Sequence, residues 1–179
     1  MSTTVVCLAN DVVQADSIVN SLKMAGFGSG AISVLMPDTT GFRDAGFEKH
    51  SKAPEGTATG AASGAVLGGA LGWLAGIGAL AIPGAGPFIA AGPLMAALSA
   101  AAVGGAVGGF SGGLIGLGIP EIEAKQYEGK VYEGNKIFIS VHTNNRDEEK
   151  TVEAIFKNGR AEDINCIQEA SVPGGKRAK

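Results

Sequence analysis

Few side chains in this sequence have the type and spacing that the chemistry of an active site requires. The two cysteines, Cys7 and Cys166, belong to no CxxC or CxxH motif, which is typical of free thiols in a reducing cytosol. The two histidines, His50 and His142, lack companions at metal-ligand spacing, so the sequence predicts no metal site. No catalytic combination of acid, base and nucleophile stands out elsewhere. We therefore expect a protein that is not an enzyme and that uses no cofactor.

Two further patterns have simple structural explanations. Cys7 and Cys166 fall in the first and last expected strands and could meet there as a redox switch, but cysteine is commonly buried for packing alone. The glycine-rich stretch 26–30 follows an expected helix and precedes an expected strand, which is the wrong order for a phosphate-binding loop.

Charge and the N-terminal residues restrict the class of protein and its compartment. The net charge of −3 and the pI near 5.4 give no indication of a nucleic-acid partner. Residues 1–5 lack the basic and apolar regions of a signal peptide, so we expect a cytoplasmic domain.

The central part of the sequence, from Gly56 to Ile119, contains no Asp, Glu, Lys, Arg or His. Glycine recurs there at every fourth position, and residues four apart lie on one face of an α-helix. A row of glycines lets a second helix approach closely, as in tightly packed membrane helices. The sequence predicts helix packing and oligomerisation through Gly60, Gly64, Gly68, Gly72 and Gly76 against Gly104, Gly108, Gly112 and Gly116.

Two helices are expected here, over Thr57–Leu80 and Leu94–Gly118, with proline and glycine breaking the chain between them. Each would be about 36 Å long, enough to span a bilayer. Seven glycines in the first helix cost roughly 7 kcal/mol relative to alanine, so a dry environment must stabilise it. The large residues expected to face lipid or another subunit are Leu67, Leu71, Trp73, Leu74, Val103, Val107, Phe110 and Leu114.

Three environments could enclose this hairpin. It could enter a membrane, or many copies could bury their hairpins inside a closed, soluble homo-oligomer. A single chain could also fold the hairpin back over its own sheet, which we expect to leave the large faces exposed. The sequence favours the membrane, with the chain itself and membrane lipid as partners.

The flanking sequences predict a small α/β domain. Strands are expected near 4–9, 32–36, 136–142 and 164–168, with a helix after the first strand and another after the third. The order β-α-β-β-α-β is that of a ferredoxin-like fold, with the hairpin inserted between the second and third strands. We expect its two halves at 1–54 and 120–170, the hairpin at 55–119 and a flexible tail at 171–179.

A family resemblance adds to this interpretation. The opening TVVCLANDVVQADSIVNSLKMAGF, the glycine-rich part with IPGAGPFIAAGPLMAAL, and the exit LIGLGIPEIEAKQYEGKVYEGNKIFISVHT resemble bacterial general stress proteins of the heat- and cold-induced families. The resemblance implies a stress-linked, membrane-associated protein and supplies no active-site residues. The leading hypothesis is a non-enzymatic stress-response scaffold that self-associates. The alternative, a ligand-sensing ferredoxin-like domain, predicts a pocket with convergent polar groups on the sheet.

Overall fold

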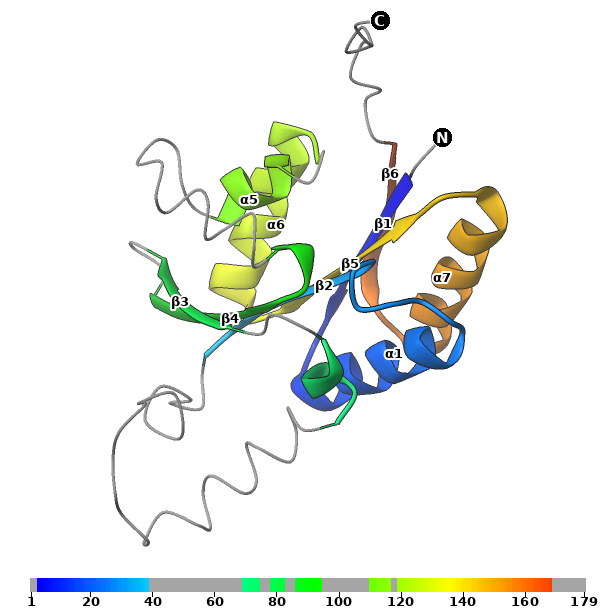
Figure 1. The fold of residues 1–179 in the computed structure, drawn as a ribbon. Helices are drawn as coiled ribbons and strands as arrows, with labels where there is room; N and C mark the ends of the chain where they lie inside the picture. The colour runs from blue at the N-terminus through cyan, green and yellow to red at the C-terminus, as the bar shows by residue number, and fades with distance from the viewer. Residues whose placement is uncertain are drawn as a thin grey trace, which may run out of the picture.

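The computed structural model describes residues 3–38, 69–74, 78–82, 86–94, 110–116 and 119–168. These residues form a mixed α/β fold on a six-stranded antiparallel sheet with the order β3-β4-β2-β5-β1-β6 (Figure 1). The strands are β1 (Thr3–Ala9), β2 (Ile32–Pro37), β3 (Gly78–Ile82), β4 (Gly86–Ala91), β5 (Ile137–Thr143) and β6 (Glu162–Gln168). The helices are α1 (Val12–Met24), α5 (Phe110–Gly116), α6 (Glu121–Gly134), α7 (Arg146–Asn158) and the short 3-10 helix η1 (Leu71–Trp73).

The four strands predicted from the flanking sequences are all present, as β1, β2, β5 and β6. They are adjacent in the sheet, where β5 pairs with both β2 and β1, and β6 pairs with the other edge of β1. The helices predicted after the first and third strands are α1 and α7.

Capping residues explain where α1 and α7 begin. The Asp11 side chain accepts a hydrogen bond from the Gln14 backbone N–H at 2.7 Å. The Asn145 side chain accepts from the backbone N–H groups of Asp147 and Glu148. These bonds satisfy donors that the first turn of a helix leaves unpaired, so both starts are encoded locally.

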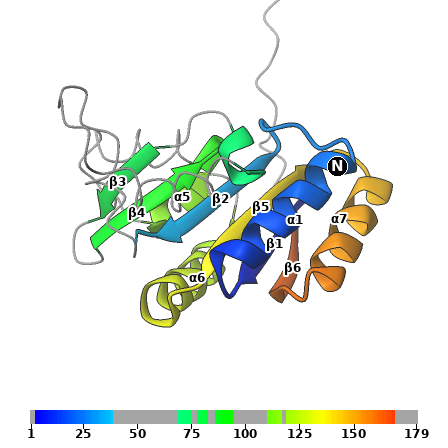
Figure 2. The same ribbon diagram turned by 90° about the horizontal axis from the view of Figure 1, so that it is seen from below.

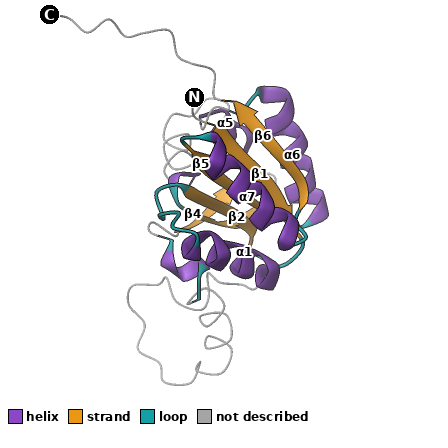
Figure 3. Cartoon of the chain, turned by 90° about the vertical axis from the view of Figure 1, so that its right-hand side faces the viewer, coloured by secondary structure: helices purple, strands orange, loops and turns teal. Residues whose placement is uncertain are grey.

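Helices cover both faces of the sheet. Figures 1 and 3 show α1 and α7 on one face, and α5 and α6 on the other. Successive side chains of a strand point to opposite faces, so Val5 and Cys7 of β1 face α1 and α7, whereas Val6 and Leu8 face α5 and α6. All four are buried. The described chain therefore has two apolar cores, one on each side of the sheet.

The core beneath α5 and α6 is rich in aromatic rings. The Phe110 ring lies 5.5 Å from that of Phe138 and 6.1 Å from that of Tyr132, while Tyr127 lies 5.2 Å from Phe138. Burial raises the pKa of both Tyr127 and Tyr132 to about 12, because an ionised phenolate is poorly solvated there. This cluster holds α5 and α6 against the sheet.

The prediction of a long helical hairpin over 55–119 is wrong for much of the part of this region that the structure describes. Residues 78–82 and 86–91 are the strands β3 and β4, which pair with each other and extend the sheet beyond β2 (Figure 2). The helix predicted over Thr57–Leu80 therefore does not reach its expected end. Its glycines disfavour a helix, whereas the edge of β2 offers hydrogen-bonding partners to an extended segment. Part of the second predicted helix is present as α5.

The glycine zipper is contradicted where it can be followed. Gly72 lies in η1, whose neighbours Leu71 and Leu74 belong to the core on the α1 and α7 face. Gly112 and Gly116 lie in α5, on the opposite face of the sheet. These glycines cannot pack together, because the sheet separates them. The remaining predicted zipper positions, Gly60, Gly64, Gly68, Gly76, Gly104 and Gly108, lie outside the described residues.

The large residues predicted to meet lipid or another subunit instead contact the chain's own sheet. Leu71 and Leu74 are buried on one face, and Phe110 and Leu114 on the other. Trp73 is partly buried, with the Lys23 ammonium 5.0 Å from its ring centroid. The described part of this region therefore folds back over its own sheet, which is the arrangement that the sequence disfavoured. The predicted positions Leu67, Val103 and Val107 lie outside the described residues.

A side chain of α1 anchors the returning chain. The Leu71 backbone N–H donates to the Asp16 carboxylate at 3.0 Å, which places η1 beside α1. None of the helices within the described ranges combines the length and the apolar composition needed to cross a bilayer.

Candidate functional site

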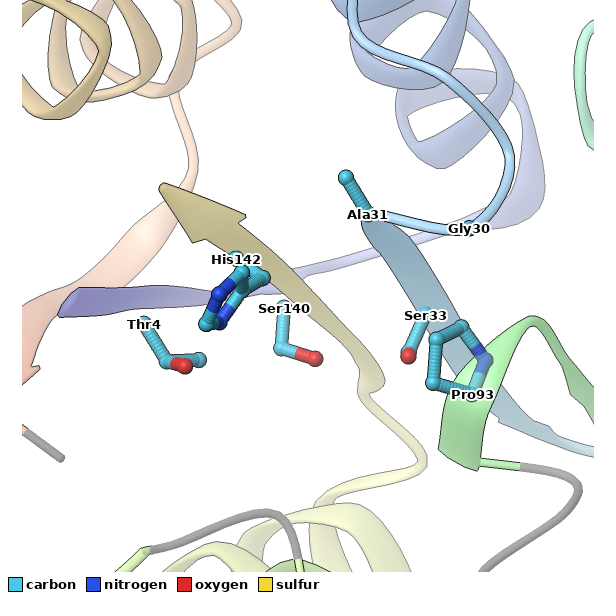
Figure 4. A pocket seen from close by; sticks show the side chains of 7 residues that line it. All are labelled: Thr4, Gly30, Ala31, Ser33, Pro93, Ser140 and His142. Atoms are coloured by element: carbon cyan, nitrogen blue, oxygen red, sulfur yellow. The ribbon is translucent and has the colours of Figure 1, made fainter. Parts of the chain in front are cut away.

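A pocket of about 240 Å³ lies on the face of the sheet that carries α5 and α6. Three neighbouring strands, β1, β2 and β5, supply most of its polar side chains, and the ends of β4 and of the loop before β2 complete it (Figure 4). The residues that line it are Thr4, Gly30, Ala31, Ser33, Pro93, Ser140 and His142.

Strand register brings the polar side chains together. Thr4 lies directly opposite His142 across the β1–β5 pair, and Ser33 lies opposite Ser140 across the β2–β5 pair. Residues two apart on a strand share a face, so Ser140 and His142 point to the same side as the core residue Phe138. The result is a polar patch at the end of an otherwise apolar face.

Three of these polar residues are deeply buried. Ser33 and Ser140 are each 3% exposed and Thr4 is 5% exposed, while His142 is partly buried. The Ser33 hydroxyl oxygen accepts a hydrogen bond from the Leu94 backbone N–H at 3.1 Å. Within the described ranges, no protein group hydrogen-bonds the Ser140 hydroxyl, which points into the pocket in Figure 4. A hydroxyl that lines a pocket can exchange hydrogen bonds with a molecule that enters it.

Backbone geometry builds the wall of the pocket opposite His142. Gly92 follows β4 with φ +75°, and a Cβ added there would come within 2.0 Å of the Ile32 carbonyl oxygen. Only glycine allows this close approach without strain, and the approach places Pro93 beside β2. On the other side, the His142 backbone N–H donates to the Ala31 carbonyl at 2.8 Å, which ties the loop before β2 to β5.

The seven lining residues offer mainly hydrogen-bonding groups. Hydroxyl groups and an imidazole can donate and accept hydrogen bonds. A serine nucleophile would need a base oriented by a third group, which in most such sites is a carboxylate. None of the seven lining residues is acidic. The arrangement thus has side-chain groups that can hold a polar molecule.

A second cluster, Glu149 and Glu153 of α7 with Cys166 of β6, lies on the opposite face of the sheet. Its potential ligand atoms lie within 4.8 Å of one another. The Cys166 thiol donates to the Glu153 carboxylate at 3.0 Å. Partial burial and the two carboxylates raise the pKa of Cys166 to about 12, so the thiol is neutral at physiological pH. A neutral thiol is a poor nucleophile, and this cluster is therefore a structural contact.

The residues singled out in the sequence are mostly dispersed. Cys7 is buried, and burial raises the pKa of its thiol well above the ordinary range. In the pairing of β1 with β6 the residue opposite Cys166 is Val5, and both cysteines are free. His142 lines the pocket, whereas its predicted companion in a metal site, His50, lies outside the described residues.

Sequence reasoning missed the three hydroxyl residues of the pocket. One local signal was present: Ser140 and His142 alternate with Ile139 and Val141 in β5, on the side that also carries Phe138. Polar residues on the inward face of a strand indicate either a hydrogen-bonded core or a site.

Comparison with protein-family models, with curated proteins and with solved structures finds no match for this chain. The resemblance to general stress proteins therefore stays a prediction from the sequence.

Proposed function

We propose that this protein is a ligand-binding module that holds a small polar molecule in the pocket between β1, β2 and β5. The carrying observation is that Thr4, Ser33 and Ser140, each at most 5% exposed, line one pocket from three neighbouring strands. Ser33, Thr4 and His142 surround the same space and add hydrogen-bonding groups. A bound molecule would exchange hydrogen bonds with these side chains.

The volume restricts the size of the molecule. Ligand pockets usually measure about 300–1,000 Å³, and a cavity of about 150 Å³ is enough for benzene. At about 240 Å³, this pocket suits a compound larger than benzene and smaller than a typical drug. A role in sensing a small metabolite fits this size better than a role in binding a peptide or a cofactor.

We further propose that the module is ferredoxin-like. The order β2-β5-β1-β6 and the position of α1 and α7 on one face support this assignment. In this interpretation the region between β2 and β5 is an insertion that adds β3 and β4 to one edge and covers the open face with α5 and α6. The pocket would then lie at the end of that face.

Binding can be tested by nuclear magnetic resonance on the full chain, with benzoate, benzamide and benzyl alcohol as probes of suitable size. We expect at least one probe to shift the backbone amide signals of Ser33, Ser140 and His142 in a saturable manner. Ser140→Ala should weaken that binding. Ser21→Ala is the matched control, because it also removes one hydroxyl but from the exposed face of α1. Binding that leaves these signals unmoved, or that both variants weaken equally, would contradict the proposal.

A second candidate function is self-association as a non-enzymatic stress-response scaffold, either at a membrane or in a closed soluble particle. It is supported by the spacing of Gly60, Gly64 and Gly68 and of Gly104 and Gly108 in two segments without charge. Fractionation without detergent, followed by mass measurement, separates the two environments. Replacing Gly68 and Gly108 with leucine should reduce particle size, and an unchanged size would count against this function.

A further inference from the structure

We infer that the ligand meets the strands of the pocket with an uncharged hydrogen-bond acceptor, such as the carbonyl of an amide or a ketone, and that the pocket disfavours ions of either sign. This inference rests on the proposed binding function and adds the chemical class of the ligand. Two properties of the lining carry it: its lack of fixed charge and the direction of its hydrogen bonds.

The lining offers no fixed charge that could neutralise an ion. None of the seven lining residues that the structure describes is Asp, Glu, Lys or Arg. The sequence that continues from Pro93 as far as Ile119 contains none either. An ion must lose part of its hydration to reach Thr4, Ser33 and Ser140, which are at most 5% exposed, and no opposite charge offsets that loss. An anion and a cation are therefore disfavoured alike, whereas a neutral polar group has less hydration to lose.

The facing hydroxyls of Ser33 and Ser140 decide the polarity of that neutral group. The two residues lie directly opposite each other across the β2–β5 pair, and Figure 4 shows both side chains on the same face of the sheet. The Ser33 oxygen accepts the Leu94 N–H at 3.1 Å, so the hydrogen of this hydroxyl remains to be donated. The Ser140 hydroxyl can rotate to donate as well. A carbonyl oxygen has two lone pairs, so it can accept from both hydroxyls without carrying a charge.

Gly30 allows the charge of the lining to be changed with little effect on packing. A Cβ added at Gly30 would meet nothing within 4 Å, and the same holds for Gly28, two residues earlier in the loop before β2. Gly30 lines the pocket, whereas Gly28 is not one of the seven lining residues. A lysine at either position adds one positive charge to the chain, but only Gly30→Lys adds it to the lining of the pocket.

The test compares four probes of nearly the same shape that differ in charge. Acetophenone and benzamide are neutral and carry a carbonyl, benzoate is an anion and benzamidinium is a cation. Titrations of the full chain follow the backbone amide signals of Ser33, Ser140 and His142, and they are made at pH 8 because His142 is the one residue of the seven that can take up a proton there. We expect each neutral probe to bind about tenfold or more tightly than either ion.

Substitutions test the two properties of the lining separately. Ser140→Ala should weaken the binding of benzamide about fivefold, and the exposed control Ser21→Ala should leave it unchanged. Gly30→Lys should tighten the binding of benzoate about tenfold, because it supplies the missing opposite charge, and Gly28→Lys should not. Dispersed amide spectra of each variant establish that it is folded.

The outcomes separate this inference from the proposed function. Binding of benzoate or benzamidinium as tightly as the neutral probes, at the same residues, overturns the inference and leaves the pocket standing as a binding site. Equal benzoate affinities of Gly30→Lys and Gly28→Lys also overturn it, because charge in the lining would then not decide the preference. If neither these four probes nor benzyl alcohol shifts the three amide signals, the binding function falls and the inference falls with it.

Discussion

Replacing Phe110 with alanine tests whether α5 belongs to the core of its own chain. The ring is fully buried and lies 5.5 Å from the Phe138 ring and 6.1 Å from the Tyr132 ring. Removing a buried phenylalanine typically lowers the free energy of unfolding by about 3–5 kcal/mol, and each lost aromatic contact contributes about 0.5–1.5 kcal/mol of that. Small domains are stable by only about 5–15 kcal/mol, so the effect should be large.

Urea unfolding followed by circular dichroism measures this loss, and Ile115→Ala supplies the control in the same helix. Ile115 is 42% exposed, so its truncation should cost less than about 1 kcal/mol. The contacts of Phe110 lie within one chain, so its effect should be the same at low and high protein concentration. A residue at a subunit interface would instead show a concentration-dependent loss.

Two results would refute this reasoning. If Phe110→Ala and Ile115→Ala cost equally little, the ring is not buried against the sheet in solution. If the cost of Phe110→Ala grows on dilution together with a fall in particle mass, the ring contacts a second copy, as the sequence alone predicted.

Three further predictions concern backbone strain and titration. Gly92→Ala should lower the free energy of unfolding by about 2 kcal/mol or more, because its φ is positive and a Cβ would collide with a carbonyl; an unchanged Tm would contradict this. Tyr127 has a pKa near 10 when unfolded and about 12 when folded, so the unfolded chain loses the proton first. Stability present below pH 10 should therefore fall as the pH rises towards 12, and less so in Tyr127→Phe, as measured by urea unfolding across this range. Cys166 should react slowly with iodoacetamide at neutral pH and faster in Glu153→Gln, because the carboxylate helps to raise the thiol pKa; equal rates by mass spectrometry would exclude this cause.

Elements with local signals could be predicted from the sequence. Asp11 and Asn145 cap α1 and α7 with bonds that span only two or three residues, so a short stretch of sequence is sufficient to place each helix start. The strands β1, β2 and β5 are short apolar runs bounded by polar or turn residues, which is the usual signal of a buried strand.

The strands β3 and β4 could not be predicted in the same way, because their pairing is not local. Gly78–Ile82 consists of small and aliphatic residues that occur in helices as readily as in strands. The deciding contact is made by β4 with β2, about fifty residues earlier in the chain. A glycine spacing of four therefore indicated a helix where tertiary pairing selected a strand.

The pocket could not be predicted from the sequence, because it depends on the register in which β1 and β2 pair with β5. Thr4, Ser33 and Ser140 come from three strands and converge only because Thr4 pairs with His142 and Ser33 with Ser140. A shift of one residue in either pairing would turn the hydroxyl of the shifted strand towards α1 and α7. The sequence singled out His142 only as a possible metal ligand, and it gave no indication that Thr4, Ser33 and Ser140 lie near it.

The position of β1 between β5 and β6 affects how the chain can be made in the cell. Both partners of this strand are synthesised more than a hundred residues after it, and Ala9 pairs with Ile137. During translation the apolar residues Val5, Val6 and Leu8 have no strand to pair with until β5 and β6 have been synthesised. Such late closure slows folding and exposes the nascent chain to aggregation, so protection of this first strand at the ribosome would be a requirement of its topology.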